Sequence, residues 1–130
     1  MKKINTKLFK LGMSKFATGV TVVTINNKNK YIGKTVNSFA ALSLKPPLVL
    51  FSLDKKSTSL KFYINSQHIG INILANNQKK ISNHFSNKSP EWDNNSFFVT
   101  SSNLPMISNA LANLECKKTK TISQGDHIIF

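Results

Sequence analysis

The sequence predicts a mainly β protein, an antiparallel β-barrel with short helices, folded as a single domain over residues 1–130. Five or six apolar segments, each no longer than about six residues, are typical of strands. They lack the regular alternation with helices that marks a parallel doubly wound sheet, so an antiparallel barrel accounts for them better. A chain with 40% apolar side chains is long enough at this length for one core and too short for two ordinary domains.

The first elements are a helix and a β-hairpin. Thr6 is a suitable N-cap for a helix that ends near Gly19. The β-branched run Thr21 to Ile25, a polar turn, and the segment Tyr31 to Val36 predict two paired strands. The apolar residues of the helix fall largely on one stripe, and they are Leu8, Leu11, Met13, Phe16 and Ala17.

Short strands and short helices alternate through the rest of the chain. Pro46 and Pro47 separate one strand from the next, because proline cannot donate to a β-ladder. Inside the second helix after them, Ile81 and Phe85 are expected to face inward. The expected elements are a strand Leu48 to Leu53, a helix Ser57 to Tyr63, a strand Ile69 to Leu74, a helix Asn76 to Phe85, a loop Ser86 to Asn103, and strands Ala110 to Lys117 and His127 to Phe130.

The net charge of +13 raises the question of a nucleic-acid partner. All 18 basic residues are lysine, so the bidentate arginine fork that usually reads guanine or clamps phosphate is absent. A lysine- and asparagine-rich chain is what a genome-wide compositional bias produces. We therefore predict no nucleic-acid partner, and keep a basic protein that binds DNA or RNA as an alternative.

The sequence predicts neither a membrane protein nor an exported one. Its longest apolar stretch, Leu48 to Phe51, is far shorter than the roughly 20 residues that span a bilayer. The lysines at the start are not followed by the apolar block of a signal peptide, so we expect a cytoplasmic protein. A single cysteine, Cys116, forms no internal disulfide, and its neighbours predict a buried strand position rather than a nucleophile.

Two polar segments, each beside an apolar strand, are the candidate site. The first polar segment, residues 35–39, contains Thr35, Val36, Asn37 and Ser38. The hydroxyl and amide groups of Thr35, Asn37 and Ser38 suit the polar edge of a planar heterocycle. The second polar segment, residues 52–58, suits a phosphate, because hydroxyls and two ammonium groups precede a helix. It contains Ser52, Asp54, Lys55, Lys56, Ser57 and Thr58. An ordinary strand end and an ordinary helix cap are the alternatives.

Other sites are not indicated by the sequence. It contains no GxGxxG, Walker, HExxH or GxSxG motif. The histidines His68, His84 and His127 are scattered and have few acidic or thiolate companions, so no metal site is predicted.

These segments resemble the flavin reductase family, the reductase components of two-component flavin-dependent monooxygenases. The resemblance runs almost from end to end and keeps the order of the family's segments. The matching segments are FATGVTVVT (residues 16–24), GKTVNSF (33–39), SLKPPLVL (43–50), DKKST (54–58), INILA (71–75), LANLEC (111–116) and GDH (125–127), with Gln78 and Phe85.

The resemblance implies a six-stranded Greek-key FMN-binding split barrel that works as a homodimer. It implies an NAD(P)H:flavin oxidoreductase that transfers a hydride to FMN or FAD and supplies a monooxygenase or another acceptor. Thr35, Asn37 and Ser38 would line the ring and ribityl chain, and Lys34 is a candidate positive charge near the ring. The phosphate would lie at Lys56, Ser57 and Thr58. Ala75 and Gln78 would lie near the ring or its tail, and His127 near the flavin and nicotinamide.

Two departures from the family leave alternatives open. Lys45 stands before the two prolines, where the family usually has an acidic or small polar residue. Relatives continue with further sheet after the Gly-Asp-His motif, whereas this sequence stops at Phe130. A non-catalytic flavin carrier and a shortened, inactive remnant therefore remain alternatives to the reductase.

Overall fold

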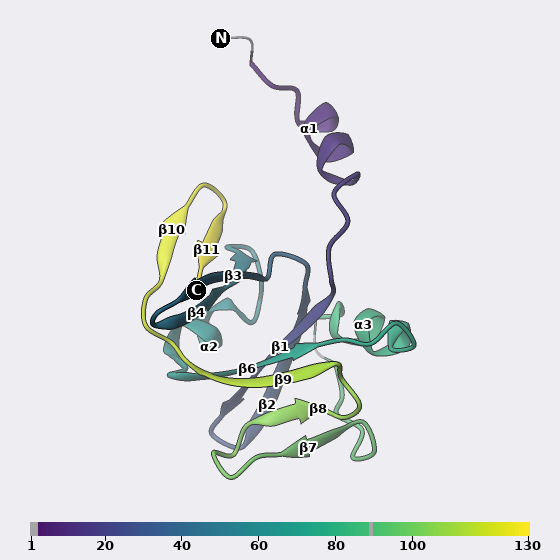
Figure 1. The fold of residues 1–130 in the computed structure, drawn as a ribbon, viewed down its shortest axis with the longest axis vertical. Helices are drawn as coiled ribbons and strands as arrows, with labels where there is room; N and C mark the ends of the chain where they lie inside the picture. Colours follow the sequence, from purple (N-terminus) through teal and green to yellow (C-terminus); the bar gives the residue numbers. More distant parts are fainter. Residues whose placement is uncertain (1–2, 89) are drawn as a thin grey trace.

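The fold is built mainly of short antiparallel strands, and a computed structural model describes residues 3–88 and 90–130 of it (Figure 1). No helix in these ranges is both long enough and apolar enough to cross a membrane. The elements are α1 (Thr6–Met13), β1 (Thr21–Asn27), β2 (Lys30–Val36), β3 (Ala40–Leu44), β4 (Pro47–Leu50), β5 (Ser52–Asp54), α2 (Leu60–Asn65), β6 (His68–Ile73), α3 (Lys79–Phe85), β7 (Phe97–Val99), β8 (Pro105–Ile107), β9 (Ala112–Lys117), β10 (Ile122–Gln124) and β11 (His127–Ile129).

The largest sheet has four antiparallel strands in the order β2-β1-β6-β9. The predicted hairpin is confirmed, with Val23 opposite Lys34 on one side and opposite Ile71 on the other. Lys28 and Asn29 turn the chain between β1 and β2 with φ of 51° and 68°. A two-residue turn with both φ values positive matches the right-handed twist of the strands that it joins.

A second sheet joins the end of the described chain to its middle. Its strand order is β10-β11-β5, and His127 on β11 lies opposite Asp54 on β5. Phe130 follows β11 and stacks on Phe51 with ring centroids 5.1 Å apart. The predicted strand at His127 to Phe130 is therefore confirmed as β11, and its aromatic end packs on the core.

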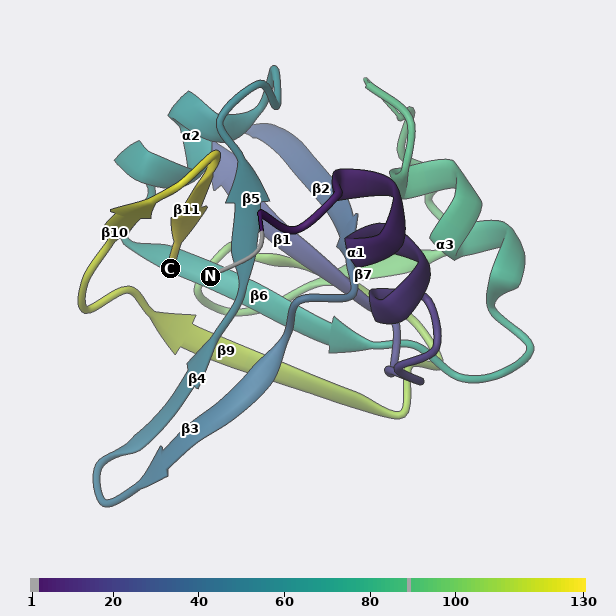
Figure 2. The ribbon, with the colours of Figure 1, turned by 90° about the horizontal axis from the view of Figure 1, so that it is seen from above.

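Two further hairpins, β3–β4 and β7–β8, depart from the sequence prediction. The expected single strand Leu48 to Leu53 is two strands, β4 and β5, which belong to different sheets. Pro47 is the first residue of β4 and lies opposite Leu44 in the ladder. Proline has no N–H to donate, and the first position of a strand is one of the few places in a sheet that tolerate it. The expected loop Ser86 to Asn103 contains β7. Figure 2 shows the β3–β4 hairpin projecting beyond the large sheet.

The helices begin and end differently from the prediction. Asn5 caps α1, its side chain accepting from the Lys7 N–H at 2.8 Å, and the helix ends at Met13. Its apolar stripe stays exposed: α1 buries no residue and extends away from the barrel (Figure 1). The predicted helix from Ser57 begins at Leu60. In α3, Phe85 is buried and Ile81 packs against the core, as predicted.

Buried residues form two hydrophobic clusters, one on each side of β1. Alternate side chains of a strand point to opposite faces, so Val23 and Ile25 enter one cluster and Val22 the other. The first cluster lies against α2, with the buried Tyr63 hydroxyl donating to the Val23 carbonyl at 2.8 Å. The second lies against α3. Both short helices therefore pack against β1, and α3 also contacts β2.

Gly33 sets how closely α3 lies to β2, and replacing it with alanine is expected to cost about 2 kcal/mol of unfolding free energy. A Cβ at this position would lie 2.6 Å from Phe85 Cδ1 and 3.1 Å from Trp92 Cζ2. Phe85 is only 2% exposed, so its ring has no free space to move into. Urea denaturation measures the loss. Gly19→Ala is the control, since a Cβ there meets nothing within 4 Å; equal stability of the two variants would contradict the prediction.

Candidate functional site

The two polar segments, distant in the sequence, are joined by Ser38 and Ser52. The Ser38 hydroxyl donates to the Ser52 carbonyl at 3.0 Å and accepts from the Ser52 N–H at 2.9 Å. This reciprocal pair holds the end of the first segment against β5, where the second segment begins. The structure therefore brings together the two halves that the sequence could only place beside separate strands.

The second polar segment leaves β5 through a tight turn formed by Asp54. The Asp54 carboxylate accepts from the Lys56 N–H at 2.7 Å, and its carbonyl accepts from the Ser57 N–H at 2.9 Å. An aspartate that bonds the backbone two residues ahead forms an Asx-turn. Asp54 therefore shapes the turn, while the side chains of Lys56 and Thr58 remain exposed and that of Ser57 is half-buried. The Ser57 hydroxyl lies 3.1 Å from that of Ser59.

A third group of predicted site residues lies at the start of α3. The Gln78 side chain is 7% exposed, accepts from the Ala75 N–H at 2.9 Å and donates to the Ser108 carbonyl at 2.7 Å. The Thr35 hydroxyl donates to the Ser82 carbonyl of α3 at 2.7 Å. The amide of Gln78 is thus engaged within the protein, where it holds the turn between β6 and α3. The Thr35 bond places α3 beside the first polar segment.

Val36 and Asn37 occupy different surroundings in the first polar segment. The Val36 side chain is 8% exposed and belongs to the first hydrophobic cluster, so it offers a ligand only its backbone. Asn37 is exposed, and its amide is accessible to a ligand. The segment therefore divides its residues between the core and the surface.

The Gly-Asp-His turn lies directly beside the second polar segment. The Lys55 N–H donates to the Asp126 carbonyl at 2.9 Å, and its ammonium group donates to the Gly125 carbonyl at 2.7 Å. Gly125 adopts a φ of 57°, which glycine tolerates best. His127 is 43% exposed, and its Nδ1 lies 2.7 Å from Asp126 Oδ1. This contact orients the ring at the surface next to Asp54.

The Asp126 carboxyl should titrate at a higher pH when His127 is replaced by alanine. The hydrogen bond and the charge of His127 hold the pKa of Asp126 below its usual value, with a smaller contribution from Lys56. The Asp126–His127 pair therefore stabilises the folded state at pH values above the usual carboxyl pKa. This stabilisation is lost as the pH falls through the lowered pKa of Asp126. A carbon-13 NMR titration of the Asp126 carboxyl measures the midpoint; the same midpoint in His127→Ala would show that the pair does not form.

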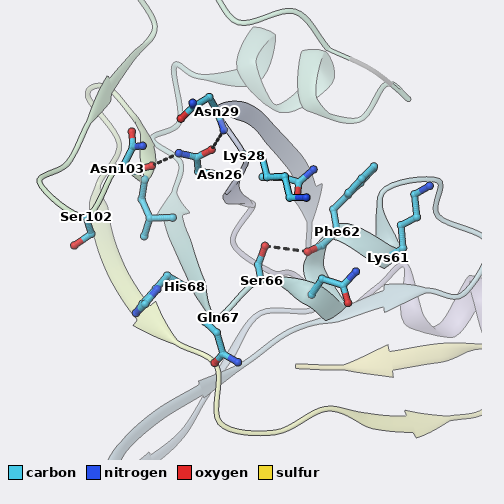
Figure 3. Close-up of a pocket in the computed structure, with 13 residues that line it drawn as sticks. Asn26, Lys28, Asn29, Lys61, Phe62, Ser66, Gln67, His68, Ser102 and Asn103 are labelled. Carbon is cyan, nitrogen blue, oxygen red and sulfur yellow. Dashed lines mark hydrogen bonds between the residues drawn. The ribbon is translucent and has the colours of Figure 1, made fainter.

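Two hollows lie near these elements. One, of about 360 Å³, lies between β2, the start of α2 and the chain after α3, and Thr58 lines it. The larger, of about 820 Å³, lies at the far end of the β1–β2 hairpin and is lined by polar side chains such as Asn26, Lys61 and His68 (Figure 3). None of the predicted site residues lines the larger hollow. Lys30, Ser59 and Lys88 also line the smaller hollow, and the sequence did not indicate them because they lie outside the two polar segments.

Metal chemistry and thiol chemistry find no support in the described residues. Within residues 3–88 and 90–130, no three His, Cys, Asp or Glu side chains are grouped to hold a metal ion. Cys116 is a half-buried residue of β9 opposite Ile69. Burial raises the pKa of its thiol, which keeps it protonated and a poor nucleophile.

Comparison with known proteins agrees with this architecture. A family model described as a flavin reductase like domain matches residues 13–130. The chain belongs to this family. The structure of the NADH:FAD oxidoreductase SgcE6 from Streptomyces globisporus superposes on this chain with a TM-score of 0.90 at 29% sequence identity. The match covers 100% of this chain and 82% of SgcE6. The predicted split barrel is therefore confirmed.

Two curated relatives of this chain carry functional names. The FMN reductase (NADH) SmoA of Agrobacterium fabrum is 36% identical over 125 residues, which cover 96% of this chain and 72% of SmoA. HsaB of Mycobacterium tuberculosis, the reductase subunit of a flavin-dependent monooxygenase, is 33% identical over 128 residues, which cover 98% of this chain and 68% of HsaB. Both resemblances include the two polar segments and extend over nearly the whole chain.

Proposed function

We propose that this protein is an NAD(P)H-dependent flavin reductase that binds FMN or FAD and passes the reduced flavin to a monooxygenase or another acceptor. The observation that carries the proposal is the Ser38–Ser52 pair, which unites the two polar segments beside the Gly-Asp-His turn. Membership in the flavin reductase family and the names of SmoA and HsaB support it.

The chemistry of the polar groups fits a flavin with a phosphate. Exposed hydroxyl, amide and ammonium groups of Asn37, Lys56 and Thr58 can donate to anionic or carbonyl oxygens. The two carboxylates nearby are engaged elsewhere: Asp54 closes its own turn, and Asp126 pairs with His127. The second polar segment therefore keeps an excess of donors, as a phosphate requires.

In this proposal the chain binds and orients, and it needs no nucleophile of its own. A bound flavin supplies the hydride acceptor, and the nicotinamide supplies the donor. Asn37, Ser38 and the Val36 backbone position the ring, and Ala75 and the turn held by Gln78 lie near the ring or its tail. Lys56, Ser57 and Thr58 hold the phosphate end, and His127 positions the nicotinamide. Holding the two rings in contact is the catalytic contribution.

We further propose that the protein works as a homodimer in the cytoplasm. Large apolar side chains stand exposed on α1 and on the β3–β4 hairpin, among them Phe9 at 52%, Leu42 at 61% and Leu44 at 89%. Water is a poor surrounding for apolar patches of this kind, and a second copy would cover them. A cytoplasmic location agrees with the single unpaired cysteine and with the supply of NAD(P)H.

The direct test is turnover by the purified protein with FMN or FAD and either NADH or NADPH. We expect loss of nicotinamide absorbance that depends on both flavin and protein. Denatured protein and flavin without protein are the controls. Tight flavin binding without turnover would support a carrier instead of a reductase, and absence of flavin binding at micromolar concentration would refute the proposal.

A further inference from the structure

The hollow beside β2 carries a concentration of positive charge that the proposed flavin-ring contacts do not use. Its volume is about 360 Å³. Lys30 and Lys34 line it from alternate positions of β2, and Lys88 lines it from the chain after α3. No Asp or Glu of the described residues lines it. Three ammonium groups around one hollow favour a ligand with more than one negative charge.

The free edge of β2 provides peptide groups on the same side. β2 is the outer strand of its sheet, and the Tyr31 carbonyl accepts from Trp92 Nε1 at 3.0 Å at this edge. Peptide groups of a strand alternate in direction, so the Gly33 N–H and C=O point to the same edge as the Tyr31 carbonyl. Gly33 is buried beside Trp92, so it borders the hollow only through its backbone.

The hollow also has an apolar wall. Ile32 of β2 and Phe62 of α2 both line it, and both are partly buried against the first hydrophobic cluster. An aromatic ring and an aliphatic side chain together offer a surface on which a planar base can rest. The hollow thus combines an apolar wall, the backbone of a strand edge and three lysines.

This hollow adjoins the proposed phosphate site. Thr58, the last residue of the second polar segment, lines it together with Ser59, whose hydroxyl lies 3.1 Å from that of Ser57. On the other side, Lys34 is the direct neighbour of Thr35 in the first polar segment. A ligand phosphate held at Ser57 and Thr58 is therefore at the entrance of the hollow.

We propose that this hollow binds the adenosine diphosphate end of FAD, which makes FAD the preferred flavin over FMN. The inference rests on the proposed function, because it extends the proposed flavin site beyond its first phosphate. The second phosphate is held by Lys30 and Lys88, and the adenine rests between Phe62 and the β2 edge. NAD(P)H also ends in adenosine diphosphate, but the shared Thr58 connects the hollow to the flavin phosphate.

The test compares the dissociation constants of FAD and FMN, measured by quenching of flavin fluorescence, in the wild-type protein and in Lys30→Gln/Lys88→Gln. Both lysines are exposed, so their replacement leaves the core untouched. We expect wild-type protein to bind FAD about 10-fold more tightly than FMN, and the double variant to lose about 10-fold in FAD affinity with FMN affinity within about 2-fold. Lys28→Gln/Lys117→Gln, two exposed lysines that do not line this hollow, is the charge-matched control and should change neither constant.

Each contrary result has a distinct meaning. If the double variant weakens FMN as much as FAD, the lysines hold the first phosphate and the inference is wrong. If it raises the KM for NADH while FAD affinity is unchanged, the hollow binds the nicotinamide dinucleotide and the inference is again wrong. If the wild-type protein binds neither flavin, the proposed function fails, and the inference fails with it.

Discussion

Replacing Asn72 with alanine is expected to lower the free energy of unfolding by about 4 kcal/mol, because it removes a buried polar centre and leaves a cavity. The Asn72 side chain is fully buried. Its Nδ2 donates to the Val22 carbonyl at 2.8 Å, and its Oδ1 accepts from the Ile107 N–H at 2.9 Å and from Asn113 Nδ2 at 2.7 Å. One side chain thus connects β1, β8 and β9.

The loss is large because Ile107 is itself fully buried, and its N–H would have no water to replace Asn72. Urea denaturation followed by circular dichroism measures the change. Asn76→Ala, at an exposed position just after β6, removes the same side chain and should alter stability by less than about 0.5 kcal/mol. Similar stability for both variants would show that the Asn72 contacts do not stabilise the fold.

The double variant Lys56→Ala/Ser57→Ala is expected to weaken flavin binding about 50-fold, equivalent to about 2.3 kcal/mol. It removes one ammonium and one hydroxyl from the proposed phosphate site. The Asp54 turn should survive, because Asp54 bonds only the backbone N–H groups of these two residues. Fluorescence quenching measures the affinity, and circular dichroism should show the unbound fold unchanged.

The control is Lys61→Ala/Ser66→Ala, which removes the same two groups from α2 and the residue after it. Both residues line the far hollow (Figure 3) and should leave flavin affinity within about 2-fold. Riboflavin, which has no phosphate, provides a second comparison: its affinity should be nearly equal in wild type and in the Lys56/Ser57 variant. Unchanged FMN affinity in that variant would place the phosphate elsewhere.

The local sequence pattern was sufficient to predict an element where the residues of that element themselves determine its secondary structure. The β-branched run of β1 and its partner β2 predicted their hairpin, and the apolar run Ile69 to Leu74 predicted the strand β6. The helix α1 shows the limit of the same reasoning. Its apolar stripe correctly predicted a helix, but a stripe does not specify what covers it, and α1 buries none of its residues.

The candidate site shows a similar division. The sequence alone indicated two polar segments with hydroxyl, amide and ammonium groups, and the family resemblance placed them in one flavin site. Ordinary strand ends and helix caps remained alternatives for each segment. Their contact through Ser38 and Ser52 depends on β5 leaving β4 to pair with β11, which connects residues more than 70 positions apart.

The sequence by itself determined the mainly β class, the strands of the large sheet and the residue types available to bind a phosphate. These properties follow from side-chain volume, β-branching and apolar periodicity, which act over a few neighbouring residues. Only the tertiary structure decided that Gln78 and Asp54 serve the backbone, that His127 lies opposite Asp54, and that three lysines surround one hollow. Those outcomes depend on strand pairing between distant segments, which local periodicity does not specify.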